Sequence, residues 1–154
     1  MRMLESAHQV MPYRHTQLGI TILVVCLIVA TLGAAVMWQR SQAPMILMLA
    51  ILATVAVIFH SLTVEIGDNE LRWHFGPGLW TYRLPLDDIQ SVAAVQNHWW
   101  NGFGIRKARG FSLYNVSGLD AVELKLKSGE TRRIGTDDPQ GLAAALRSAA
   151  HTGG

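Results

Sequence analysis

LGITILVVCLIVATLGAAVMW, residues 18–38, is a run of 21 residues without a charged side chain. At a rise of 1.5 Å per residue, a helix of this length reaches about 31 Å, which matches a hydrocarbon core of roughly 30 Å. A second apolar run, residues 43–62, follows after the short polar break 39–42. Its strictly apolar part, 45–59, is shorter and needs flanking residues to cross a bilayer. We therefore expect a two-helix transmembrane hairpin over residues 17–62.

Basic residues on either side of the two runs predict the orientation. Two arginines precede the first span and two follow the second within about 20 residues, whereas the turn between the spans carries only Arg40. The four flanking residues are Arg2, Arg14, Arg72 and Arg83. Because cytoplasmic segments are enriched in Lys and Arg, we expect a multi-pass protein of the inner (plasma) membrane with both termini, including the N-terminal segment 1–16, in the cytoplasm.

A cleaved signal peptide is the competing interpretation of the first run. Ser41-Gln42-Ala43 has small residues spaced like a cleavage site. The apolar run ahead of it is, however, longer than the roughly 7 to 15 residues of a usual signal-peptide core. Cleavage there would leave one span and would place the following domain outside the cytoplasm.

Composition excludes several classes of protein. Hydrophobic residues make up 50% of the chain and charged residues only 16%, against roughly 25% charged in an average soluble domain. The single cysteine, Cys26, rules out an intramolecular disulfide and any site with several cysteine ligands. A formal net charge of +2 gives no basis for nucleic-acid binding.

From Ser61 onward the pattern changes to an alternation of apolar and polar residues. Leu71, Trp73 and Phe75 alternate with polar residues, which is typical of a strand with one buried face. Turn residues such as those in Gly76-Pro77-Gly78 separate similar segments. We expect a mainly-β domain over residues 63–154, with a terminal amphipathic helix that begins at Pro139. The seven predicted strands cover about 62–66, 70–75, 80–84, 89–95, 111–114, 122–127 and 130–134, with a loop at 96–110.

This order of elements resembles the small bacterial membrane proteins that carry a pleckstrin-homology-like (bacterial PH) domain. The strings that prompt the resemblance are YRHTQ (13–17), RWHFGPG (72–78), WWNGFGIR (99–106), YNVSGLD (114–120) and RIGTDDP (133–139). The resemblance implies a nearly closed, seven-stranded PH-like barrel with a C-terminal capping helix, used to bind lipid head groups, peptides or proteins. Phosphoinositide-binding members carry a basic cluster between their first two strands, whereas Gly67-Asp68-Asn69 is short and acidic here. Inositol phosphates are therefore poor candidates for the ligand.

The segment 97–109 combines aromatic and basic residues as no other stretch does: Trp99, Trp100, Phe103, Arg106, Lys107 and Arg109. Tryptophan favours the membrane interface, and each basic residue near an anionic leaflet contributes on the order of 1 kcal/mol. The segment therefore predicts membrane contact. Two other interpretations stay open. The tryptophans can plug one end of the barrel, or the segment can bind a protein, because Trp and Arg dominate interface hot spots.

Catalytic patterns are weak in this sequence. No two histidines are three or four residues apart, as paired metal ligands on one helix face would be. Asp87-Asp88 and Asp137-Asp138 suit turn and cap positions. We expect no enzyme activity, no metal and no cofactor, and instead a membrane-anchored binding or scaffold module at the cytoplasmic face. Its expected partners are the lipid bilayer, anionic head groups or a membrane protein. The alternative is an accessory subunit that holds a protein partner through the barrel or the transmembrane helices.

Overall fold

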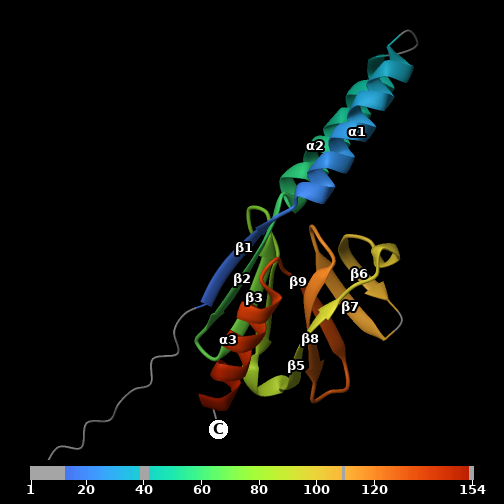
Figure 1. The fold of residues 1–154 in the computed structure, drawn as a ribbon. Helices are drawn as coiled ribbons and strands as arrows, with labels where there is room; N and C mark the ends of the chain where they lie inside the picture. Colours follow the sequence, from blue (N-terminus) through green and yellow to red (C-terminus); the bar gives the residue numbers. More distant parts are fainter. Residues whose placement is uncertain (1–12, 39–41, 109, 153–154) are drawn as a thin grey trace, which may run out of the picture.

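The computed structural model describes residues 13–38, 42–108 and 110–152, and in it two long helices project from a β-rich domain (Figure 1). The helices are α1 (Ile20–Met37) and α2 (Gln42–Phe59). Each has 18 residues and is long and apolar enough to cross a membrane. Helix α2 ends before the predicted limit of the second span because Ser61 and Leu62 already belong to a strand.

Helices α1 and α2 pack closely against each other and leave their other faces bare. Gly33 lies against the Met48 side chain, so that a Cβ at position 33 would come within 2.6 Å of the Met48 sulfur. At the base of the hairpin, the Gly19 amide donates a hydrogen bond to the His60 carbonyl oxygen over 2.6 Å. Residues such as Leu27 and Leu47 remain exposed. An apolar surface of this extent is stable in lipid rather than in water.

The hairpin is inserted between two neighbouring strands of one sheet. Strand β1 (Tyr13–Leu18) pairs antiparallel with β2 (Ser61–Gly67), so that Leu18 lies opposite Ser61. The sequence pattern predicted no strand in segment 1–16, because YRHTQL offers polar side chains even at the positions that face the core. Since β1 and β2 are paired, both ends of the hairpin lie on the same side of the helices.

The nine strands of the described residues form two sheets. Sheet A has the order β1-β2-β3-β4, and sheet B has the order β5-β8-β9-β7-β6. All pairs are antiparallel except β7 with β9, which is parallel. The remaining elements are β3 (Glu70–Phe75), β4 (Thr81–Pro85), η1 (Leu86–Asp88), β5 (Ile89–Gln96), η2 (Trp99–Asn101), β6 (Gly104–Ala108), β7 (Phe111–Asn115), β8 (Asp120–Leu126), β9 (Thr131–Gly135) and α3 (Pro139–Thr152).

The strand pattern differs from the sequence-based prediction in two places. All seven predicted strands are present, but β1 is an additional strand, and β6 lies inside the predicted loop 96–110. β6 was missed because Gly-Ile-Arg-Lys-Ala has a single large apolar residue, too few for an alternating pattern. Over residues 13–38, 42–108 and 110–152 the strand pairings give two separate sheets, so a closed seven-stranded barrel is not confirmed.

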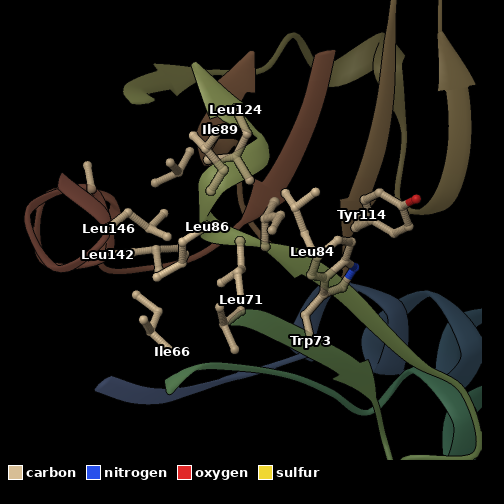
Figure 2. Close-up of a cluster of buried hydrophobic side chains, with 14 of the residues drawn as sticks. Ile66, Leu71, Trp73, Leu84, Leu86, Ile89, Tyr114, Leu124, Leu142 and Leu146 are labelled. Atoms are coloured by element: carbon tan, nitrogen blue, oxygen red, sulfur yellow. The ribbon is translucent and has the colours of Figure 1, made fainter. Parts of the chain in front are cut away.

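The hydrophobic core lies between the two sheets and helix α3 (Figure 2). Leu142 and Leu146 of α3 are fully buried in it. Asp138 caps this helix, since its Oδ1 accepts a hydrogen bond from the Gly141 amide over 3.0 Å, and the predicted start at Pro139 is confirmed. Trp73 fills the centre, with its ring 5.5 Å from the Tyr82 ring and 5.2 Å from the Tyr114 ring.

Candidate functional site

Three strand connections of the β domain lie at the base of the hairpin, and together they form what we call the hairpin end (Figure 1). They are 76–80 between β3 and β4, 97–103 between β5 and β6, and 116–119 between β7 and β8. The Gly76 amide donates to the Ser61 carbonyl oxygen over 2.8 Å. Ser117 Oγ lies 2.9 Å from Thr21 Oγ1 of α1. None of the three connections contains Asp, Glu, Lys or Arg.

The hairpin end carries the exposed apolar side chains of the domain. Outside the hairpin (residues 20–59), the large hydrophobic residues that are exposed in the described part of the chain are Leu18, Leu79, Trp80, Trp99, Trp100 and Ile105. Leu18 lies two residues before the start of α1, and Ile105 is the second residue of β6, beside the helices. The other four lie in the connections 76–80 and 97–103. Exposed apolar groups of a soluble protein scatter singly over its surface, whereas here they gather at one end.

Trp99 and Trp100 stand out from the domain on the short helix η2. Their rings lie 5.9 Å apart and nearly perpendicular, and the Trp100 ring stacks on His98 at 4.2 Å. Trp99 is 75% exposed and Trp100 is 63% exposed. The two rings therefore form an outward aromatic block, and the interior of the domain is filled by Trp73 instead.

An ion pair beneath this block fixes the place where the connection 97–103 begins. Arg133 Nη2 lies 2.7 Å from Glu123 Oε2, and both side chains are mostly buried. Arg133 Nη1 also donates to Asn97 Oδ1 over 3.2 Å. The backbone N–H of Asn97 in turn donates to the Leu119 carbonyl oxygen over 2.6 Å. The tryptophans thus project from a connection that is bonded at its root to sheet B and to the neighbouring connection.

Asn115 shapes the connection 116–119 and ties it to the helices. Its Nδ2 donates to the Gly118 carbonyl oxygen over 2.9 Å, and its Oδ1 accepts from the Ser117 amide over 3.2 Å. The Ser117 carbonyl oxygen accepts from Gln17 Nε2 over 2.9 Å. A Cβ at Gly135 would overlap the buried Asn115 side chain, so this position requires glycine. These bonds join sheet B to β1 at the base of α1.

A groove of about 580 Å³ runs between the hairpin and the β6 side of the domain. Cys26 of α1 and Leu52 of α2 line one wall, and Phe103 and Ile105 line the other. Arg106 is the only charged residue among those that line the groove. Its Nε donates to the Phe103 carbonyl oxygen over 3.2 Å. The groove is therefore apolar along most of its length, with one cation at its wall.

The structure brings together four of the six residues that the sequence singled out. Trp99, Trp100, Phe103 and Arg106 all belong to the hairpin end or to the adjoining groove. Lys107 lies in a separate hollow of about 210 Å³ with Glu130. Arg109 lies outside the described residues. The three basic residues are therefore not seen as one cluster.

Sequence reasoning missed Leu79, Trp80 and Ile105 as members of this surface. The alternation of Trp80 with Tyr82 and Leu84 predicted a buried strand position, but β4 begins one residue later, and Trp80 is 60% exposed. A signal was available in the chain order. β2 leaves the hairpin and β3 returns to it, so the connection after β3 has to lie beside the helices.

The hairpin end presents a surface of exposed rings and apolar side chains. In the described part of the chain, no group of three His, Cys, Asp or Glu side chains is arranged to hold a metal ion. No protein-family model matches the sequence, and no curated protein matches it either. At the hairpin end, aromatic rings, an apolar groove and one arginine adjoin two apolar helices.

Proposed function

We propose that this chain is an inner-membrane protein with two spans, whose β domain rests with its hairpin end in the cytoplasmic surface of the bilayer. The domain acts there as a non-enzymatic binding or scaffold module. Trp99, Trp100 and Trp80 lie among the lipid head groups, and the remainder of the domain faces the cytoplasm. The observation that carries this proposal is the gathering of the exposed apolar side chains at the hairpin end.

The length of the helices supports this depth of the domain. An α-helix of 18 residues is about 27 Å long, slightly shorter than a hydrocarbon core of roughly 30 Å. The hydrocarbon core of the bilayer must therefore reach both ends of the helical hairpin. This leaves the hairpin end of the β domain at the level of the lipid head groups. Trp38, at the opposite end of α1, is 77% exposed. Tryptophans thus stand at both ends of the spans, in the positions of the two aromatic belts of membrane proteins.

The cytoplasmic orientation is supported by the arginines. Arg14, Arg72 and Arg83 lie on the domain side of the spans within the described residues. The sequence places only Arg40 in the turn on the other side. An excess of basic residues marks the side that stays in the cytoplasm.

A PH-like architecture is part of the proposal. It is supported by the antiparallel meander of sheet A and by a C-terminal helix that packs against the core between the sheets. In such a module the strand connections at one end meet the membrane, while the sheet edges and the far end remain available for a ligand. The basic loop that binds phosphoinositides in other members is replaced here by Gly67-Asp68-Asn69, which lies away from the hairpin.

Depth-dependent quenching of tryptophan fluorescence tests the proposal. The full chain is reconstituted in phosphatidylcholine vesicles that contain brominated acyl chains, using variants that retain one tryptophan and have Phe at the other four positions. We expect strong quenching of Trp99 and of Trp80. Trp73, which is fully buried in the core, is the internal control and remains bright.

Two results would contradict this proposal. The first is that brominated lipid quenches Trp99 and Trp80 no more than it quenches Trp73. The second is that a water-soluble quencher added outside the vesicles quenches Trp99 and Trp80 as efficiently as it quenches free tryptophan. Because phosphatidylcholine is zwitterionic, this experiment tests the contact of the rings with the bilayer and is independent of head-group charge.

A second candidate function is favoured by strand β6. It is the terminal strand of sheet B, so its outer edge has no strand partner among the described residues, and it carries the exposed Ile105. An edge of this kind can accept a strand from another protein. An accessory subunit would then co-purify in mild detergent with one stoichiometric partner, which a proline at Lys107 would release. Purification of the chain alone would contradict this function.

A further inference from the structure

We propose that the groove between the hairpin and β6 binds one anionic phospholipid, with an acyl chain along the groove and the phosphate at Arg106. This inference rests on the proposed function, because a lipid enters the groove only if the hairpin end sits in the membrane surface. It adds a specific binding site and a ligand class to what would otherwise be general contact with the bilayer.

The depth of the groove walls supports an acyl chain as the occupant. Cys26 and Leu52 line the groove and lie about 9 Å and 10 Å along their helices from the hairpin base, at 1.5 Å per residue. The helices are only about 27 Å long, so these two residues stand within the hydrocarbon core. Lipid chains surround any apolar surface at that depth. The volume of about 580 Å³ also falls in the usual range of small-ligand sites.

A transmembrane helix of a partner fits the groove less well. A helix about 10 Å wide that rises 1.5 Å per residue takes up roughly 120 Å³ per residue. The groove volume therefore accommodates little more than one helical turn. The groove is also closed towards the domain by Phe103 and Ile105, so a longer helix would collide with the connection 97–103.

Arg106 is held in a position to bind a phosphate. Its Nε is fixed by the Phe103 carbonyl oxygen, and its guanidinium lies against the backbone of Gly102, where a Cβ would come within 3.0 Å of Arg106 Cζ. Glycine is also favoured at position 102 by its backbone, because its φ of 72° lies in the left-handed region. Arg106 forms no ion pair with any residue the structure describes. The N–H groups on Nη1 and Nη2 are thus free for a bidentate contact with phosphate oxygens.

The lining of the groove favours a lipid whose head group is anionic over a zwitterionic one. None of the residues that line the groove is Asp or Glu. A zwitterionic head group brings an ammonium group beside its phosphate, and that ammonium finds no acidic partner here. Phosphatidylglycerol brings the phosphate alone, which Arg106 neutralises in a partly desolvated site.

Native mass spectrometry of the full chain in mild detergent tests the site. The protein is incubated with an equimolar mixture of phosphatidylglycerol and phosphatidylcholine, and the bound lipid is identified by mass. We expect one retained phosphatidylglycerol, and a fall of about tenfold or more in its retention in Arg106→Gln. Lys107→Gln is the matched control, since it removes the neighbouring cation, which lies in the separate hollow, and retention should change less than twofold.

A second pair of variants tests the acyl chain. Cys26→Phe fills the groove and is expected to abolish retention of the lipid. Ile28→Phe adds the same ring on an exposed part of α1 outside the groove and is expected to leave retention unchanged. Circular dichroism and thermal unfolding of each variant show whether the fold is intact.

The inference is overturned if both lipids are retained equally, or if Arg106→Gln retains as much phosphatidylglycerol as Lys107→Gln. It is also overturned if a co-purifying protein is bound to the chain and no lipid is retained. The tryptophan quenching described above uses phosphatidylcholine alone and does not require Arg106. Loss of selective retention with quenching intact therefore rejects the lipid site and leaves the proposed function standing. Loss of quenching rejects both.

Discussion

The two ends of the β domain are built from strand connections of opposite character. The connections at the hairpin end contain no charged residue and present tryptophans. The distal end consists of 67–69, 86–88 and 127–130, which carry Asp68, Asp87, Asp88, Lys127 and Glu130. There the turns bond to one another: Asn69 Nδ2 donates to Asp87 Oδ2 over 3.0 Å, and the Lys127 amide donates to the Asp88 carbonyl oxygen over 2.9 Å.

In the proposed placement, this difference matches the two environments of the domain. Both ends close the same two sheets, and glycine occurs in connections at each end. Water around the distal end solvates carboxylates and ammonium groups, whereas the hairpin end offers only side chains that an interface stabilises. In the proposed placement, the turn residues at each end therefore suit the solvent of that end.

The largest effect tests whether β1 holds the hairpin end together. A fragment that starts at residue 61 lacks β1 and leaves six positions of β2 without their partners. At about 0.5–1.5 kcal/mol for each net hydrogen bond, the loss is about 3 kcal/mol or more, comparable to much of the stability of a small domain. We expect this fragment to unfold without cooperativity when it is followed by near-ultraviolet circular dichroism.

The control for this experiment restores β1 without the spans. Residues 13–18 are joined to residues 61–154 through Asn-Gly, because Leu18 and Ser61 are paired neighbours and a two-residue turn suits such a hairpin. This version should unfold cooperatively. If the fragment 61–154 unfolds as cooperatively as the joined version, β1 contributes little.

The next effect separates the buried tryptophan from the exposed ones. Trp73→Ala removes a fully buried ring and should lower the free energy of unfolding by about 3–5 kcal/mol. Trp99→Ala should change it by no more than about 0.5 kcal/mol in detergent, since this ring is mostly exposed. Chemical denaturation of the full chain gives both values. A large loss of stability in Trp99→Ala would mean that the hairpin end is part of the core.

A smaller effect compares the ion pairs that serve the two ends. Arg133→Gln leaves Glu123 mostly buried without its cation and removes the bond to Asn97, at a cost of about 1–3 kcal/mol. Arg132→Gln breaks the more exposed pair with Glu130 at the distal end and should cost under about 1 kcal/mol. Chemical denaturation measures both losses in the free energy of unfolding. Equal losses would contradict the stronger stabilisation that we assign to the Arg133 ion pair.

The smallest effect concerns Tyr13, which lies opposite Ile66 beside the distal connection 67–69. Burial, followed by the neighbouring Asp138, raises the pKa of the Tyr13 phenol from 10.0 to about 12. Its hydroxyl donates to Asp138 Oδ2 over 3.4 Å. Because the folded-state pKa lies above the unfolded value, the stabilisation is complete below pH 10 and is lost as the pH rises through about 12. The phenolate absorbance of the wild type minus that of Tyr13→Phe should show a midpoint near 12, and a midpoint near 10 would contradict this placement.

The long-range features of the fold followed from strong patterns in the sequence. The two apolar runs predicted both helices, and the alternation around Trp73 and around Leu124 predicted strands whose apolar side chains form the core. β6 was not predicted because it has too few apolar residues, and β1 was not predicted because a polar residue occupies its buried position. Gln17 is buried between β2 and the Ser117 turn, a site that an alternation rule assigns to an apolar residue.

The missed strand β6 also affected the prediction of the site. Each strand reverses the direction of the chain, so overlooking one assigns every later connection to the wrong end. With β6 omitted, the connection 116–119 would fall at the distal end, whereas Ser117 contacts Thr21. The separation of Arg106, in the groove, from Lys107, in its own hollow, likewise could not be foreseen where the sequence predicted a loop.

The insertion of the hairpin between β1 and β2 has a consequence for biosynthesis. The ribosome completes β1 first, and its pairing partner emerges only after residues 19–60 have been made, on the order of seconds later. During that interval β1 has no pairing strand. If the two helices cross the bilayer as proposed, an N-terminus left on the opposite side would separate β1 from β2 and leave that edge of β2 unpaired. Sheet A could then be completed only when both ends of the hairpin are on the same side of the membrane.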